Sequence, residues 1–120
     1  MPFAFEKLIV YQKAVVFAGA VCTLTKDFPG GFWFLTDQLN RAPLSIATNI
    51  AEGNVRFTKA DRRNFFTIAR GSVQECVPLL EIARRTGLLA DEAALAMKAD
   101  LEEIARRLSV LINGLDKRKA

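Results

Sequence analysis

Apolar residues recur along the chain at the spacing of an α-helix rather than at the alternating spacing of a strand. Toward the C-terminus they fall at i, i+4, i+7, i+11, i+14 and i+18, which places them on one helix face. These residues are Met97, Leu101, Ile104, Leu108, Leu111 and Leu115. An earlier segment has a similar face made of Phe65, Ile68, Ala69, Ser72, Cys76, Leu79 and Ala83, with Arg63, Arg70, Gln74 and Glu81 opposite. The pattern predicts an all-α protein whose helices pack through apolar faces.

Three clusters of helix-breaking and capping residues divide this pattern into four segments. Pro29, followed by two glycines, is expected to stop the first helix. Gly53 is predicted to end the second helix, and Thr58 to cap the third through a capping-box pattern. Gly87 and Asp91 are expected to end the third helix and to cap the fourth. The predicted helices span about 5–27, 32–53, 58–86 and 91–115.

Long helices with short connections pack as antiparallel neighbours. We therefore expect an up-down-up-down four-helix bundle over residues 1–116, followed by a basic tail at 117–120. Pro43 and Pro78 fall near the middle of two helices. Because the apolar pattern continues past both prolines, we expect them to kink the helices rather than to end them.

The first helix is apolar around its whole circumference from Ala14 to Cys22. A single four-helix bundle cannot cover every side of such a helix, so we expect a second copy of the chain to cover the remaining face. The apolar stretch ends at Leu24 and is too short to cross a bilayer, which takes about 20 residues. We therefore predict a homo-oligomer with no membrane association.

The composition narrows the chemistry that the chain can perform. With 120 residues, 51% of them apolar and 25% charged, the chain is predicted to form one folded domain. It has no histidine, which removes the commonest general base and metal ligand. Its cysteines, Cys22 and Cys76, match no metal-binding spacing and are expected to be reduced core residues. We predict no catalytic residue, cofactor or metal, and a cytoplasmic location because no signal peptide is recognisable.

The segment QLNRAPLSIATNIAEG, residues 38–53, carries a polar stripe on its predicted helix. Arg41, Ser45, Thr48 and Glu52 fall within about 60° of one another, with Asn49 on the flank. Because a buried charge needs a partner, we predict a partly buried pair between Arg41 and Glu75, within or between subunits. The predicted polar seam comprises Arg41, Ser45, Asn49, Glu52, Ser72 and Glu75.

Catalysis by the seam is disfavoured on chemical grounds. No lysine or histidine neighbours Ser45 or Ser72 in the sequence to activate a serine nucleophile. A glycine-rich phosphate loop is also missing, since Gly30 and Gly31 lack the lysine that would follow. An unrecognised ligand site remains an open alternative.

The excess positive charge lies in one window of the sequence. Arg56, Lys59, Arg62, Arg63 and Arg70 face only one acid there, and the rest of the chain holds twelve charges of each sign. The first four cations, which we call the basic corner, straddle the second connection, near Phe57 and Phe65, and Arg70 is predicted to share an outward face with Arg63. Such a cluster is typical of phosphate binding, with a solvated face as the alternative.

The stretch QLNRAPLSIATNIAEG, followed by ARGSVQE at 69–75, resembles the bacterial four-helix bundle protein family, also called the ribosomal intervening-sequence protein family. The opening FEKLIVYQKA and the joint LTKDFP match as well. That family is similar to the accessory protein of diversity-generating retroelements, a basic homopentameric barrel that binds a reverse transcriptase and nucleic acid. The resemblance implies an all-α fold and a pentameric ring. Pro43 and Pro78 depart from the family pattern.

Two function classes follow from these observations. The first is a non-catalytic oligomeric scaffold that binds RNA or DNA through the cations between residues 56 and 70. The second is a protein-interaction scaffold for a partner enzyme, such as a polymerase or nuclease. An enzyme is a distant third, because the chain shows no recognisable catalytic set.

Overall fold

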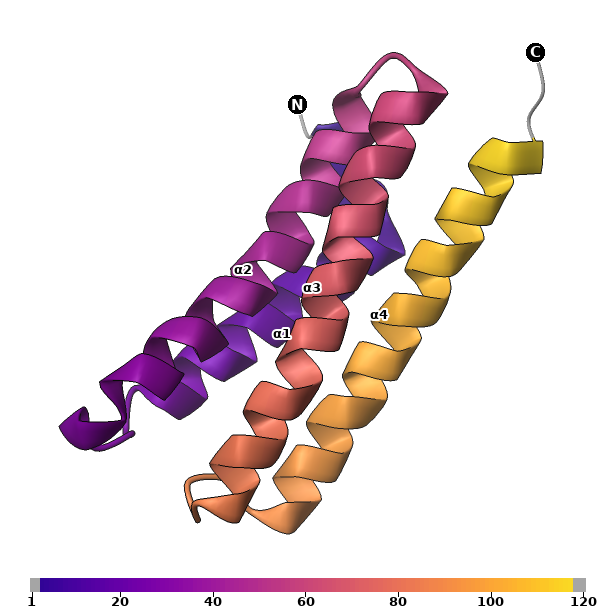
Figure 1. Cartoon of the computed structure of the whole chain (residues 1–120). Helices are drawn as coiled ribbons and strands as arrows, with labels where there is room; N and C mark the ends of the chain where they lie inside the picture. The colour runs from indigo at the N-terminus through magenta and orange to yellow at the C-terminus, as the bar shows by residue number, and fades with distance from the viewer. Residues whose placement is uncertain (1–2, 118–120) are drawn as a thin grey trace.

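The computed structural model of the chain describes residues 3–117, which form helices and short connections and contain no strand. An elongated molecule of 52 × 28 × 21 Å results (Figure 1). The elements in order are η1 (Ala4–Lys7), α1 (Ile9–Thr25), η2 (Gly30–Phe32), α2 (Trp33–Val55), α3 (Lys59–Arg85) and α4 (Asp91–Lys117). The all-α prediction is confirmed. Of the predicted basic tail, residues 118–120 lie outside the described range.

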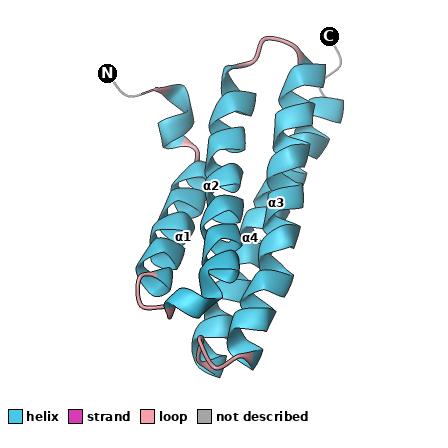
Figure 2. Ribbon diagram, turned by 60° about the vertical axis from the view of Figure 1, so that its left-hand side comes forward, coloured by secondary structure: helices cyan, strands magenta, loops and turns pink. Residues whose placement is uncertain are grey.

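Successive long helices lie side by side and are joined at alternate ends (Figures 1 and 2). The connection between α2 and α3 lies at the same end of the molecule as η1 and the C-terminal end of α4, and the other two connections lie at the opposite end. The helices themselves continue past both internal prolines, Pro43 in α2 and Pro78 in α3. The prediction that these prolines do not end their helices is confirmed.

The first helix differs from its predicted span of 5–27. It begins only at Ile9, because Leu8 has an extended backbone with φ −71° and ψ 125°. The turn lets the ring of Phe5 pack edge-on against Tyr11 at 5.0 Å between centroids. A continuous helix would place these two residues on different faces, so the aromatic contact and the break belong together.

The core runs the length of the bundle, and α4 contributes to it as predicted. Leu101, Ile104, Leu108 and Leu115 are buried, while Met97 and Leu111 pack against them. In α3 the prediction was wrong for part of the face. The buried residues there are Phe66, Ala69, Ser72, Val73, Cys76, Leu80 and Ala83, whereas Phe65, Ile68 and Leu79 are more exposed. In the adjacent apolar pairs Phe65–Phe66 and Leu79–Leu80, either residue could face the core, depending on how the helix is rotated about its axis. Packing against the other helices selects the rotation that buries Phe66 and Leu80.

The connections confirm two of the predicted helix ends and correct a third. The Thr58 hydroxyl accepts a hydrogen bond from the Asp61 N–H at 3.1 Å, which caps α3. Gly87 has φ +81°, and the N–H of Leu88 reaches the carbonyl of Ala83, which closes α3 in a Schellman motif. Gly53, predicted to end α2, instead lies inside it, because the helix continues to Val55.

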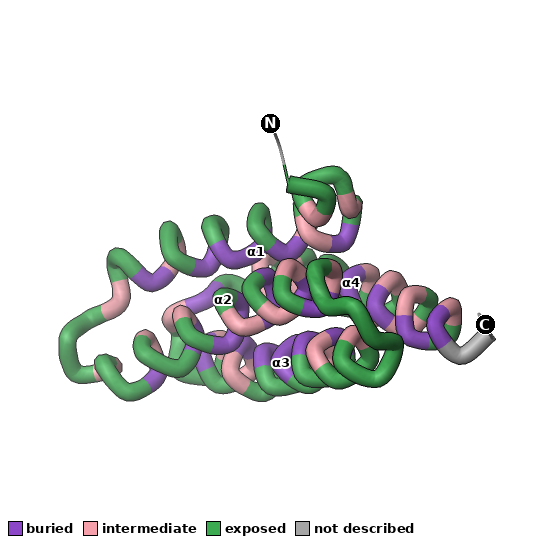
Figure 3. Tube along the Cα trace, turned by 90° about the horizontal axis from the view of Figure 1, so that it is seen from above, coloured by how far each residue is buried: buried purple, intermediate pink, exposed green. Residues whose placement is uncertain are grey.

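Helix α1 buries one face and exposes the other, as the tube in Figure 3 shows. Val10, Ala14, Phe17 and Val21 face the core. On the outer face Val15, Val16, Gly19, Ala20 and Cys22 are exposed, so the prediction that Cys22 lies in the core was wrong. Cys76 is buried as predicted. Within residues 3–117, no helix has both the length and the apolar character needed to cross a membrane.

Candidate nucleic-acid interface

The basic corner surrounds the tight connection between α2 and α3, at the upper end of the molecule in Figure 1. The connection consists of residues 56–58, between the end of α2 and the start of α3. Arg56 and Thr58 both have extended backbones, with ψ near 150° and 151°. The Arg56 N–H still reaches the carbonyl of Gly53 at 3.4 Å, so the connection leaves α2 through a hydrogen-bonded turn.

The Arg56 side chain is oriented by two contacts. Its Nη2 lies 2.7 Å from Oε2 of Glu52, one turn earlier in α2. The guanidinium carbon also lies 4.7 Å from the centre of the Phe65 ring, within cation–π range. The Arg56 side chain remains 43% exposed, so its guanidinium stays at the surface beside the Glu52 carboxylate.

Arg62 fixes the connection from the other side. Its Nε donates a 2.7 Å hydrogen bond to the carbonyl oxygen of Arg56. A guanidinium carries five N–H donors, so this bond leaves most of its donors for other acceptors. Lys59 and Arg63 are exposed in the first turns of α3. The structure therefore brings the four cations of the basic corner together at one end of the molecule.

Arg70 lies elsewhere. Its Nη1 donates a 3.0 Å hydrogen bond to Oγ of Ser109 in α4, and the residue is half-buried. Arg63 and Arg70 lie two turns apart on one face of α3, as predicted, but Arg70 does not point outward, because its guanidinium turns toward α4. Arg70 joins α3 to α4, and the basic corner consists of the other four cations.

Phe57 occupies the tip of the connection and is 100% exposed. An apolar residue just before a helix cap commonly packs on the fourth residue of the helix, but that position here is Arg62. The full exposure of Phe57 was missed at the sequence level. The charged Arg62 at the fourth position of α3 was the feature of the sequence that could have indicated this exposure.

The predicted polar seam forms only in part. Ser45 and Ser72 share a 2.8 Å hydrogen bond between α2 and α3. Asn49 donates to Oγ of Ser45 at 3.0 Å. These three residues satisfy one another at the helix interface.

The charged members of the seam lie on the surface. Arg41 pairs with Asp37 at 3.1 Å and its side chain is 74% exposed, so the predicted pair of Arg41 with Glu75 is wrong within this chain. Glu75 is exposed on α3, and Glu52 pairs with Arg56. The Arg41–Asp37 pair forms because the two side chains are one turn apart on the same exposed helix face.

A second polar contact between helices was not predicted. The hydroxyl of Thr25 at the end of α1 donates to Oδ1 of Asn40 in α2 at 2.9 Å. Thr25 is only 5% exposed, so this bond satisfies a polar group within the bundle. This bond was only weakly indicated by the sequence, because a threonine at the end of an apolar helix is equally expected as a helix cap.

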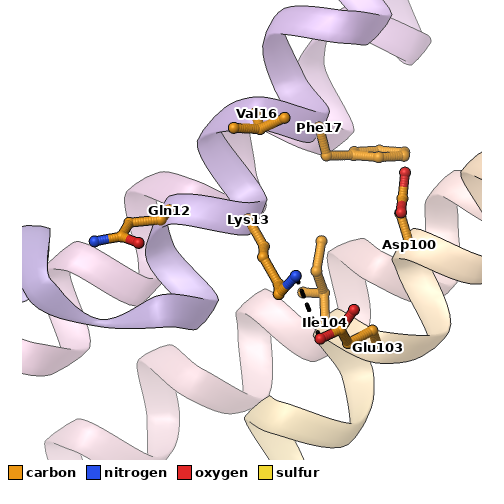
Figure 4. Close-up of a pocket in the computed structure, with 7 residues that line it drawn as sticks. All are labelled: Gln12, Lys13, Val16, Phe17, Asp100, Glu103 and Ile104. Carbon is orange, nitrogen blue, oxygen red and sulfur yellow. Dashed lines mark ion pairs between the residues drawn. The ribbon is translucent and has the colours of Figure 1, made fainter.

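A cavity of about 230 Å³ lies between α1 and α4, lined by Gln12, Lys13, Val16, Phe17, Asp100, Glu103 and Ile104 (Figure 4). Lys13 bridges it, with Nζ 3.3 Å from Oε2 of Glu103. Arg107 binds the same carboxylate, and the two cations hold the pKa of Glu103 below its usual range, Arg107 contributing most. A paired carboxylate therefore lies in the wall of the cavity.

The remaining reactive groups are placed away from the basic corner. Burial raises the pKa of the Cys76 thiol to about 12, with a smaller contribution from the charge of Glu75, so this thiol stays protonated. Among the side chains that the structure describes, no three carboxylates or thiols come together as metal ligands would. The chemistry that the basic corner offers is the binding of anions.

The family model described as 23S rRNA-intervening sequence protein matches residues 6–110. The chain belongs to this family. Among solved structures, this intervening-sequence protein is similar to a protein with unknown function from the S23 ribosomal protein family of Bacteroides thetaiotaomicron, with 27% identity. The match covers 88% of this chain and 96% of that one, at a TM-score of 0.81. No curated protein matches the chain. The family predicted from the sequence motifs is confirmed.

Proposed function

We propose that this intervening-sequence protein is a non-catalytic oligomeric scaffold that binds the backbone of a nucleic acid through its basic corner. The observation that carries the proposal is the clustering of Arg56, Lys59, Arg62 and Arg63 around one short connection. Cations in such a cluster attract phosphates with little dependence on base sequence.

The position of the basic corner strengthens its electrostatic attraction for anions. Lys59, Arg62 and Arg63 lie at the start of α3, where the helix dipole is also positive. Asp61 is the acid of that first turn. Each cation at the positive end of the helix dipole costs roughly a few tenths of a kcal/mol of stability. A bound phosphate would offset this repulsion between the cations and the dipole.

The second part of the proposal is assembly. The antiparallel up-down-up-down bundle forms a homo-oligomer through the outer face of α1, whose Val15, Val16, Gly19, Ala20 and Cys22 are exposed. The resemblance to the retroelement accessory protein favours a pentameric ring. A ring repeats the basic corner once per subunit, so weak phosphate contacts add up to useful avidity.

RNA is the nucleic acid to test first. The family description names an intervening sequence of 23S rRNA, and the cations of the basic corner suit the phosphates of a folded RNA. Duplex DNA presents the same phosphates and serves as the comparison ligand.

The test compares two charge reversals of equal size. Lys59→Glu changes the basic corner, and Lys26→Glu changes an exposed lysine at the opposite end of the molecule. Binding of a labelled structured RNA is measured over a salt series. We expect Lys59→Glu to weaken binding and to flatten the salt dependence by about one phosphate contact per bound subunit, and Lys26→Glu to change neither.

Two results would contradict the proposal. The first is a wild-type protein that binds neither RNA nor DNA at low salt, and the second is equal weakening by both reversals. The first of these results would favour the second candidate function, a protein-interaction scaffold for a partner enzyme. It is supported by a groove of about 610 Å³ between the start of α1 and α4, with apolar walls and cations at its edge, lined by Lys7, Leu8, Ile9, Val10, Arg106, Arg107, Val110 and Leu111.

A further inference from the structure

We propose that the basic corner binds unpaired nucleotides, and that the Phe57 ring provides the surface on which one of their bases stacks. This inference rests on the proposed function and specifies its ligand as a single-stranded segment. The juxtaposition that carries it is a fully exposed aromatic ring on the short connection that the four cations flank.

The exposure of Phe57 is not accounted for by packing. Its side chain is 100% exposed, whereas other exposed aromatics of the chain contact a neighbouring ring. Trp33 and Phe34 pack edge to face at 6.1 Å, and Phe3 stacks with Phe5 at 5.6 Å. Phe57 makes no such ring contact among the described residues. A ring that contributes nothing to the bundle is available to a ligand.

The backbone on both sides of Phe57 is held in place. The Arg56 carbonyl accepts the hydrogen bond from Arg62, and Thr58 caps α3 through the Asp61 N–H. These bonds hold the backbone of the connection in place at one end of the molecule (Figure 2). A backbone that is already ordered loses little conformational freedom on binding, which favours affinity.

The choice of ligand follows from the presence of an aromatic ring and of cations on the same short connection. The aromatic ring offers a stacking face, and the cations around it offer phosphate contacts. Bases in a duplex are already stacked between their neighbours, so a ring at the surface cannot reach their faces. Unpaired bases can turn outward and stack on the ring while their phosphates meet Lys59 and Arg62.

The experiment measures binding of an unstructured single-stranded RNA and of a duplex of the same length by fluorescence anisotropy. Phe57→Ala is compared with Phe34→Ala, which removes another exposed phenylalanine at the opposite end of α2. We expect Phe57→Ala to weaken single-strand binding by about five- to a hundredfold and duplex binding by less than about twofold. Phe57→Tyr should restore most of the single-strand affinity, because it retains the stacking face.

A spectroscopic signature reports stacking directly. Trp33 is the sole tryptophan, so Phe57→Trp in a Trp33→Phe background leaves one indole at the tip of the connection. We expect its fluorescence to be quenched by the single strand and not by the duplex. Single-stranded DNA of the same sequence separates recognition of unpaired bases from recognition of the ribose.

The two proposals fail in different ways. If wild-type protein binds no nucleic acid at low salt, the proposed function fails. If it binds but Phe57→Ala weakens single strand and duplex equally, or neither, only the stacking inference is overturned. It is overturned too if the indole responds to vesicles of phosphatidylcholine and phosphatidylserine but not to the single strand. Because Phe57 is fully exposed, its variants should keep the melting temperature of the wild type.

Discussion

At the scale of single residues, Gly53 shows how one backbone position brings two helices together. A Cβ atom at this position would lie 2.7 Å from Cε1 of Phe66 and 3.1 Å from Cβ of Phe65. Both contacts are closer than carbon atoms tolerate without movement. The glycine therefore serves the close approach of α2 to α3 directly beside the basic corner, rather than the end of its own helix.

We expect Gly53→Ala to lower the free energy of unfolding by about 1–3 kcal/mol, because the added methyl group overpacks against Phe66. Urea denaturation measures this change. Gly71→Ala is the matched control, since Gly71 is exposed in α3 and a Cβ there meets nothing within 4 Å. Alanine should stabilise that position by up to about 1 kcal/mol. Equal effects of the two substitutions would show that Phe66 moves aside without cost.

At the scale of elements, α3 ends in an ion-pair cluster that ties it to α4. Glu81 binds Arg84 at 2.9 Å and Arg85 at 2.8 Å, and Arg84 also binds Asp91 at 3.2 Å across the connection. Hydrogen bonds from Arg84 and then Arg85 lower the pKa of Glu81 to about 2. The hydrogen bonds that Arg84 donates to Glu81 and Asp91 raise its own pKa. The cluster thus favours the ionised form of Glu81 in the folded protein.

This cluster predicts a loss of stability in acid. Because the pKa of Glu81 falls from 4.5 to about 2 on folding, the unfolded chain binds more protons between these values. The free energy of unfolding should therefore decrease as the pH falls from about 4.5 toward 2. Glu103 adds to the decrease, since its pKa is also lowered.

Thermal unfolding over this pH range compares Glu81→Gln with Glu75→Gln, which removes an exposed carboxylate from the same helix. The Glu81 variant should show a shallower pH dependence than the wild type, and high salt should reduce the difference because the cluster is exposed to solvent. A Glu81 variant with the full acid dependence of the wild type would mean that the cluster does not persist in solution.

At the scale of the whole molecule, the apolar outer face of α1 and the basic corner occupy separate parts of the surface. The outer face of α1 runs along one side of the bundle, and the basic corner lies at one end (Figures 1 and 3). An assembly through α1 therefore leaves the end connections of each subunit accessible. This arrangement is what a scaffold with repeated phosphate sites requires.

We expect Val16→Glu to reduce the mass of the assembled protein, because a charge would be placed at a side chain that is 72% exposed on the outer face of α1. Sedimentation equilibrium measures the mass. Leu95→Glu, at a residue 69% exposed on α4, is the matched control and should leave the mass unchanged. A wild-type monomer, or a Val16 variant with the wild-type mass, would exclude α1 as the assembly surface.

Several features of this protein were determined by the sequence alone because they depend on neighbours in the chain. Helical periodicity set the fold class and the buried face of α4. The cap at Thr58 and the turn at Gly87 depend on residues within one helical turn. The clustering of cations around a short connection also followed from their spacing.

Other features were decided only by the tertiary structure, because they depend on distances between helices. The rotation of α3 placed Phe66 rather than Phe65 in the core, and the approach of that ring gave Gly53 its role. Packing likewise turned Arg70 toward Ser109 and left Phe57 without any apolar neighbour. Local pattern identifies which residues can be buried, but the shape of the opposing helix selects which of them are.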